Sequence, residues 1–319
     1  MTSPFDSSYC MHALAGEQPS CFSQWQLSMV CPKQSVIQHA FVPRVPPSLF
    51  LDVGAHDGRD AIAYASKGRH TVLSFEPSPA KIPAIRANIA RAPRLAAQQI
   101  TLVEAAVADT DGEALFAAAG GEADGLVLGG AQQGPQPAIA IARTPGGTRR
   151  SAVSAASRAE ERLVTVNVTT LDRAVRERDR ATGTIPPIAL LKIDAQGHDV
   201  AALYGAARLL RRRRVFAVVM EVTPSLVPPQ RGDGATVYAE AIEWLDTLGY
   251  ACFQCADCRE RLKTPLHGAC RGMALPISGR GAARANFTAL ANLPKFYYRG
   301  TGPHGWWTDV VCAARAVSR

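Results

Sequence analysis

Short apolar runs separated by helix-length segments are the feature that most limits what this chain can fold into. Four of these runs carry almost no polar residue, and they span residues 49–53, 72–75, 188–193 and 215–221. Uninterrupted apolar runs of this length are typical of strands that are buried on both faces of a parallel sheet. Because helix-length segments alternate with them, we expect a doubly wound α/β fold with helices on both faces of the sheet.

Weaker patterns supply the other expected elements. Further strands are predicted over residues 100–107, 164–168, 250–255 and 309–314. Helices are predicted over residues 59–67, 79–91, 171–180, 200–213 and 235–248. The last two strands are expected to close the sheet, since they follow the last predicted helix.

Two stretches fall outside this alternation. Residues 1–47 are interpreted as an irregular N-terminal arm, because the prolines at its end remove backbone donors. Residues 118–160 are rich in Ala, Gly, Pro and Gln and can bury little apolar area, so they predict a flexible insertion. We therefore expect a single domain over residues 48–319, interrupted by this insertion.

Composition and charge exclude several classes of protein. The chain has 319 residues, 47% of them apolar, which is enough for one large core. The formal net charge is +8, but Arg211 to Arg214 form a run that fits the end of a surface helix, and no nucleic-acid partner is expected. No apolar run reaches the roughly 18 residues of a membrane span, and residues 1–16 do not resemble a signal peptide. A cytoplasmic location is the default expectation, and no oligomeric state is predicted.

The candidate ligand-binding residues are those at the ends of strands, because ligands of open α/β sheets bind beyond the carboxyl ends of the strands. The first such segment is DVGAHDG, residues 52–58. Gly54 permits a tight turn, and Gly58 lets a helix start close by. The spacing is neither G-x-G-x-x-G nor a P-loop, so a phosphate cradle is not indicated. The acids Asp52 and Asp57 instead suit a cofactor with a cationic part and hydroxyl groups.

Glu76 ends the second predicted strand, 24 residues after Asp52. A carboxylate at this place can accept hydrogen bonds from the two hydroxyls of a ribose. A solvated acid in front of a turn proline is the alternative interpretation. The glycine turn at the preceding strand favours the ribose role.

Five segments within residues 49–255 read LFLDVGAHDGRDA, LSFEPSP, VTTLD, LLKIDAQGHDVAALYGAARLL and VVMEV. Together they resemble the FkbM family of S-adenosylmethionine-dependent methyltransferases. The resemblance implies a Rossmann-like methyltransferase sheet, mostly parallel with an antiparallel closing strand, and S-adenosylmethionine as the cofactor. One departure is visible: the family usually has Glu-Gly in the middle of the fourth segment, where this chain has Gln196-Gly197.

The resemblance also implies which residues bind the cofactor. Glu76 would hold the ribose, Val107 and Asp109 would flank the adenine, and Asp194 would face both cofactor and acceptor. Asp52 is counted with the cofactor-binding residues because it precedes the turn. The methionine and sulfonium part would be wrapped by Gly54, Ala55, His56, Asp57 and Gly58.

The turn after the fourth strand of the predicted parallel sheet carries the candidate catalytic residues, Asp194 and His198. Transfer to a hydroxyl is helped by a base that removes its proton, and His198 is the candidate base because its ordinary pKa lies near neutrality. A purely structural histidine at a helix start is the alternative. Lys192 is expected to form an ion pair that supports the sheet. Glu221 fits the acceptor side and a surface acid equally well.

The expected activity is O-methylation of a hydroxyl on a small molecule or glycan, with the preference for oxygen resting on the resemblance. Two alternatives remain open: a non-catalytic protein with this cofactor fold, and a nicotinamide-dependent oxidoreductase that would lack its pyrophosphate cradle. No metal site is expected. Buried thiols or a disulfide are favoured over zinc for the cysteine cluster, which comprises Cys252, Cys255, Cys258 and Cys270.

Overall fold

The fold is taken from a computed structural model, which describes residues 46–68, 70–118, 125–127, 162–255, 274–281, 283–284 and 308–315. The predicted arm therefore lies outside the described residues except for residues 46–47. The predicted insertion also lies outside them, except for residue 118 and residues 125–127.

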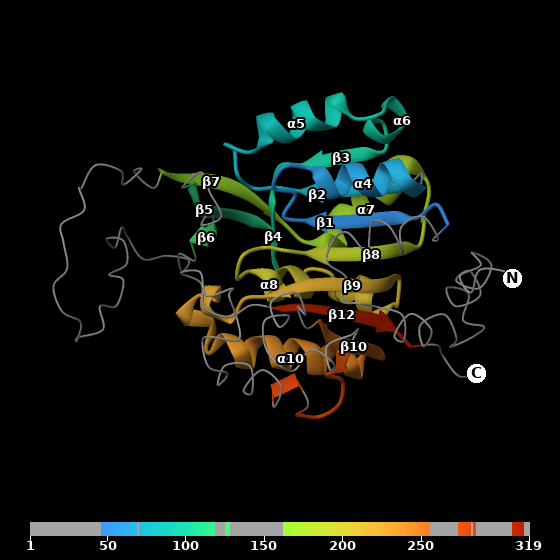
Figure 1. The fold of residues 1–319 in the computed structure, drawn as a ribbon. Coiled ribbons are helices and arrows are strands. Elements are labelled where there is room, and N and C mark those ends of the chain that lie inside the picture. The colour runs from blue at the N-terminus through green and yellow to red at the C-terminus, as the bar shows by residue number, and fades with distance from the viewer. Residues whose placement is uncertain are drawn as a thin grey trace, which may run out of the picture.

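The main sheet has eight strands in the order β11-β10-β12-β9-β8-β1-β2-β3 (Figure 1). Strands β3, β2, β1, β8 and β9 are parallel, whereas β12 is antiparallel to both of its neighbours, β9 and β10. The expected doubly wound, Rossmann-like and mostly parallel sheet is thus confirmed. Its antiparallel strand β12 is inserted between two others, and the edge strand β11 is antiparallel to β10 as well. The strands are β1 (Leu49–Val53), β2 (Thr71–Phe75), β3 (Ile100–Val103), β8 (Ile188–Ile193), β9 (Val215–Val222), β10 (Tyr250–Cys255), β11 (Ala274–Pro276) and β12 (Thr308–Ala314).

Helices pack on both faces of this sheet. Side chains of α4 (Arg59–Gly68) and α6 (Arg94–Ala97) form one apolar cluster with Phe50 of β1. Side chains of the helices in the second half of the chain form the larger apolar cluster, together with Leu49 and Leu51 of the same strand. Those helices are α7 (Leu171–Thr182), α8 (Asp199–Tyr204), α9 (Ala207–Arg211) and α10 (Gly234–Thr247). Successive residues of β1 therefore face opposite layers, and both faces are buried, which is why four of the five residues of this strand are apolar.

The segment predicted as one strand over residues 100–107 is two strands in two sheets. β3 ends at Val103, and β4 (Ala106–Val107) then pairs with β7 (Arg162–Thr169) outside the main sheet. The apolar character continues through residues 100–107 because both strands are partly or fully buried. The sequence pattern does not reveal where the chain leaves one sheet for the other.

The helix predicted over residues 200–213 is also divided. α8 ends before Gly205, where an added Cβ would lie 2.2 Å from the carbonyl oxygen of Ala108. The carboxylate of Asp172 then accepts the backbone N–H groups of Arg208 and Leu209, which starts α9. A close chain crossing and a side-chain cap from α7 therefore replace a continuous helix.

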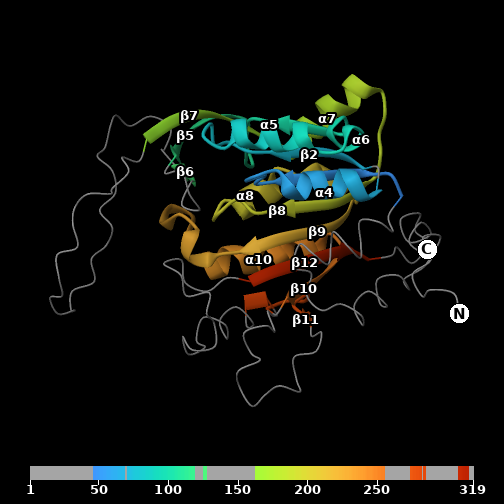
Figure 2. The same cartoon turned by 45° about the horizontal axis from the view of Figure 1, so that its top comes forward.

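A second, four-stranded sheet with the order β4-β7-β5-β6 was not predicted. It contains β5 (Gly112–Ala118) and β6 (Gly125–Val127), and the strand expected over residues 164–168 belongs to it as β7. Phe116 and Val166 form its buried face with Ala106. The small sheet lies beside the end of the main sheet at which β1 and β8 terminate (Figures 1 and 2).

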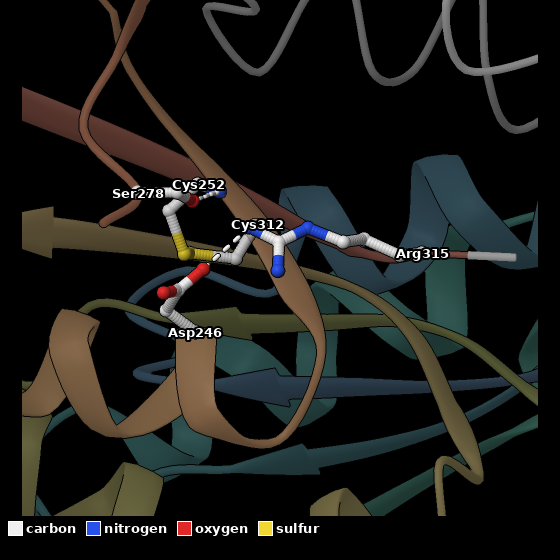
Figure 3. The surroundings of a disulfide bond; sticks show 5 residues. All are labelled: Asp246, Cys252, Ser278, Cys312 and Arg315. Atoms are coloured by element: carbon white, nitrogen blue, oxygen red, sulfur yellow. Dashed lines mark hydrogen bonds and ion pairs between the residues drawn. A yellow bond between two sulfur atoms is a disulfide. The ribbon is translucent and has the colours of Figure 1, made fainter. Parts of the chain in front are cut away.

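A disulfide joins Cys252 and Cys312, which lie directly opposite each other on β10 and β12. Figure 3 shows the bond beside Ser278, whose hydroxyl oxygen accepts the backbone N–H of Cys252 at 2.6 Å. A disulfide was one of the two alternatives favoured over zinc, but its partner Cys312 was not foreseen. Cys258 and Cys270 lie outside the described residues, and the described part of the chain contains no cluster of three or more potential metal ligands.

No helix among the described residues combines the length and the apolar character needed to cross a bilayer.

Candidate functional site

The site lies where the strand order of the main sheet reverses. The chain proceeds from β1 to β2 and β3 on one side, whereas β8 and β9 lie on the other side of β1. The backbone N–H of Asp194 donates to the carbonyl of Val53 at 3.0 Å, so the loops after β1 and β8 touch at their start. An added Cβ on Gly54, whose φ is +83°, would lie 1.9 Å from the carbonyl oxygen of Asp194. Only glycine fits here, and the two loops separate from this point.

The turn after β1 uses its own backbone donors. The N–H groups of Gly54 and Ala55 both donate to the carbonyl of Phe75, and the N–H of Gly58 donates to the carbonyl of Ala55. The N–H of His56, a residue with φ of +53°, donates to the Glu76 carboxylate. A pyrophosphate cradle needs such donors to point at the ligand. The N–H groups of Gly54, Ala55, His56 and Gly58 are bonded within the protein, which counts against the nicotinamide alternative.

Glu76 lies at the end of β2 and is 4% exposed. Its Oε2 accepts the N–H of His56 at 2.9 Å, and its Oε1 accepts the N–H of Ser78 at 3.0 Å. Each carboxylate oxygen can accept a further hydrogen bond. Glu76 is therefore not the solvated acid of the alternative interpretation; it is held in one orientation with acceptor capacity to spare.

The other residues of the turn have distinct surroundings. Ala55 packs against Ile85 of α5 (Ile82–Arg91), and an added Cβ on Gly58 would lie 3.2 Å from the same isoleucine. Asp57 is partly exposed and pairs with Arg59 at 2.8 Å. Ala55 and Gly58 thus set the approach of α5.

Asp52 does not belong to the turn itself. Its side chain is fully buried, accepts a hydrogen bond from the Ser74 hydroxyl at 2.8 Å and pairs with the Lys192 ammonium at 3.2 Å. The residue faces α4, on the opposite side of β1 from Leu51 and Val53, because strand residues alternate. The expectation of a direct cofactor contact is therefore corrected: Asp52 supports the site from within the sheet.

Lys192 connects the two halves of the site, which confirms the predicted ion pair. Its Nζ also donates to the Gly54 carbonyl at 3.1 Å, and it lies 3.5 Å from Asp60 and 3.9 Å from Asp194. Burial alone lowers the pKa of this ammonium, but the surrounding carboxylates raise the pKa well above its ordinary value. Lys192 therefore stays charged and neutralises part of the buried negative charge.

The second half of the site joins two acids through an amide. Gln196 has φ of +49°, and its Nε2 donates to Asp194 Oδ1 at 2.9 Å and to Glu221 Oε2 at 3.2 Å. Burial, followed by the negative charge of Asp194, raises the pKa of Glu221 to about 9. Glu221 is therefore a half-buried acid held beside Asp194 and not a fully solvated surface acid.

Asp199 and His198 follow the same turn. Asp199 is fully buried and accepts the N–H groups of Ala195 and Gly197 together with the hydroxyl of Tyr238. Burial raises the pKa of Asp199 to about 6. Asp199 thus fixes the turn that presents Asp194. His198 is the N-cap residue of α8 and is 5% exposed, so its ring is almost wholly enclosed by protein.

Val107 and Asp109 do not follow the third strand of the main sheet directly. That strand ends at Val103, and Val107 is a buried residue of β4 in the second sheet. Asp109 lies two residues further and is 3.9 Å from Arg231, which sits in the 3₁₀ turn Pro229–Arg231. The predicted strand over residues 100–107 therefore ends earlier than expected, at Val103, and the adenine-flanking role of Val107 and Asp109 stays a prediction.

Comparison with protein-family models identifies a matching domain. The model of the methyltransferase FkbM domain matches residues 52–252, which is more than half of the chain. None of the curated proteins matches it.

Several solved structures are similar at low identity. A methyltransferase FkbM from Methylobacillus flagellatus KT is 12% identical with a TM-score of 0.34, over 55% of this chain and 33% of that one. This chain therefore spans about a third of that protein. A precorrin-6y C5,15-methyltransferase from Geobacter metallireducens GS-15 is 13% identical with a TM-score of 0.33, over 69% and 72% of the two chains. A cofactor-bound protein from MTB is 12% identical with a TM-score of 0.39, over 99% and 100%. The family model alone carries the assignment: the chain belongs to the FkbM methyltransferase family.

Proposed function

We propose that this protein transfers a methyl group from S-adenosylmethionine to a hydroxyl of a small molecule or glycan. Family membership supports methyl transfer, whereas the cofactor and the oxygen acceptor go further. The observation that carries the proposal is the meeting of three features at one edge of the sheet. These are the glycine turn at Gly54, the fixed carboxylate of Glu76 and the acid Asp194.

The chemistry of these residues fits the cofactor. Glu76 has acceptor capacity for two neighbouring ribose hydroxyls. The side chain of Asp194 is 32% exposed and lies next to Gly54, where its negative charge favours a cationic ligand group. Four backbone N–H groups of the turn, those of Gly54, Ala55, His56 and Gly58, are already used, so a ligand without phosphates fits better than a dinucleotide. When bound, the cofactor supplies a methyl group on a positively charged sulfur.

The protein's part in the reaction is to position the acceptor and to take its proton. A bond forms between the acceptor oxygen and the methyl carbon, while the carbon–sulfur bond breaks and its electron pair stays on sulfur. Holding the two partners in line and excluding water supplies much of the acceleration. The proton of the acceptor passes to a base, for which Asp194 and His198 are the candidates.

Calorimetry with S-adenosylmethionine, S-adenosylhomocysteine and NAD tests the cofactor. We expect heat with the first two ligands only, and no binding of S-adenosylmethionine would refute the proposal. The change Glu76→Ala should weaken binding by about 1–3 kcal/mol, because charged hydrogen bonds to the ribose are lost. Glu177→Ala, which removes an exposed carboxylate on α7, is the control and should leave affinity unchanged. An unaltered dissociation constant for the Glu76 variant would reject the ribose role.

Transfer of a labelled methyl group to a panel of hydroxylated small molecules and glycans tests the acceptor. In that assay His198→Ala should lower kcat more than it changes cofactor affinity, and equal turnover would remove His198 as the base. If the wild-type chain binds the cofactor but labels nothing in the panel, the non-catalytic alternative gains.

A further inference from the structure

The bridge between Asp194 and Glu221 has no place in the reaction as described so far. Asp194 follows β8, and Glu221 lies near the end of β9, so the two carboxyl groups come from neighbouring parallel strands. The single amide nitrogen of Gln196 lies 2.9 Å from an oxygen of the first and 3.2 Å from an oxygen of the second. This geometry holds two acids close together with a donor between them.

The charges around Glu221 are mostly negative. Asp194 comes from the loop after β8, Asp199 from the start of α8, and Asp309 from β12, where it is the direct cross-strand partner of Glu221. Among the described residues, the nearby cation is Lys192. Its ammonium group lies 3.9 Å from Asp194 and also pairs with Asp52 and Asp60. Repulsion between like charges in such surroundings disfavours the ionisation of Glu221 beside Asp194.

We propose that Glu221 is a positioning residue that holds a proton against the Asp194 carboxylate, so that the pair presents one negative charge to the methyl donor and acceptor. Gln196 fixes the separation of the two acids by donating to both. The assignment of Asp194 to the donor and acceptor rests on the proposed function, whereas the retained proton rests only on the bridge and its surroundings.

The retained proton has a consequence for ligand selection. Ionisation of Glu221 places a second negative charge beside the position proposed for the sulfonium. S-adenosylmethionine carries that positive charge, and S-adenosylhomocysteine, which is otherwise the same, does not. The ratio of the two affinities therefore reports the charge of the acid pair and cancels the contributions of groups that carry the same charge in both ligands. We expect this ratio to rise as the pKa of about 9 is passed.

The proton itself is tested without a ligand. Infrared difference spectra between the wild-type protein and Glu221→Gln should show a protonated carboxyl band at pH 7.5 that fades by pH 10. Glu240→Gln, which alters an exposed carboxylate on α10, is the control and should show no such band at pH 7.5. A missing band in the wild type, or a band that persists in the Glu221 variant, would overturn the inference.

The ligand ratio tests the positioning. Calorimetry at pH 7.5 and 9.5 should show a several-fold rise in the preference for S-adenosylmethionine in the wild type and a constant preference in Glu221→Gln. A constant ratio in the wild type, with both ligands bound, would overturn the positioning role. If neither ligand binds, the proposed cofactor is wrong, and the infrared band then decides whether Glu221 holds the proton.

Discussion

The site has two halves, one at the ends of β1 and β2 and one at the ends of β8 and β9, and their acids have different hydrogen-bond partners. At β1 and β2 each carboxylate has at least one donor of its own: the Ser74 hydroxyl for Asp52, which also pairs with Lys192, and two backbone amides for Glu76. At β8 and β9 the acids Asp194 and Glu221 share one amide and face each other. The first arrangement fixes geometry, because each carboxylate is held by more than one partner. The second makes charge variable, because a proton can enter or leave. Within one sheet edge, a rigid half adjoins a titratable half.

The largest expected effect comes from a steric clash at the point where the two halves of the site are in contact. Gly54→Ala places a Cβ 1.9 Å from the Asp194 carbonyl oxygen at a φ of +83°. We expect a loss of about 5 kcal/mol in the free energy of unfolding, since backbone must move against backbone. Denaturant unfolding measures it.

Gly183→Ala separates this clash from the cost of the backbone conformation alone. Gly183 has φ of +65° at the end of α7, and nothing lies within 4 Å of an added Cβ. Its replacement should cost about 1–2 kcal/mol. Equal losses in the two variants would show that the halves are not in contact at Gly54.

The next effect tests whether the first half depends on its buried ion pairs. Lys192→Met removes the cation and leaves Asp52 buried without its charge partner, so we expect a loss of about 3–5 kcal/mol in unfolding free energy. Arg173→Met, which removes the exposed pair with Glu177, is the control and should change stability by less than about 0.5 kcal/mol. Similar values for both variants would contradict the idea of a rigid half that depends on its buried ion pairs.

The smallest effect sharpens the description of the titratable half. The folded-state pKa of Glu221, about 9, lies above the ordinary 4.5, so the folded state binds this proton more tightly than the unfolded state. Its contribution to stability is complete below pH 4.5 and is lost as the pH rises to about 9. Between pH 5.5 and pH 8.5 the free energy of unfolding should therefore fall by about 1–3 kcal/mol more in the wild type than in Glu221→Gln. Parallel pH profiles for the two proteins would contradict a retained proton.

The main sheet was predictable because burial on both faces leaves a direct mark on sequence. β1 and β8 are buried at every position, and their apolar runs end where the strands end. Gly54 and Glu76 could be found for the same reason, since each stands at a strand end in a known relation to the next element. Local sequence encodes these strand ends, whereas the contacts of Gly54 with Asp194 and of Glu76 with His56 come from the fold.

The second sheet and the acid bridge depend on pairings that local sequence does not encode. β5 pairs with β7 across about 50 residues. Its sequence, GEALFAA, contains several small residues and does not show the pattern expected of a strand. Glu221 was left undecided, because its surroundings are set by Asp194 and Gln196, 25 or more residues away. The partner of Cys252 likewise follows from the register of β10 with β12, and cysteine spacing carries no information on register.

The disulfide closes a covalent ring of the chain, because its two cysteines are 60 residues apart. A protease that cuts the backbone once between them would yield two pieces that remain attached through sulfur. The nicked chain would keep the mass of the whole on a gel without reductant and separate into fragments only after reduction. Strand β12, which stands between β9 and β10, would thus stay tethered to its place after such a cut.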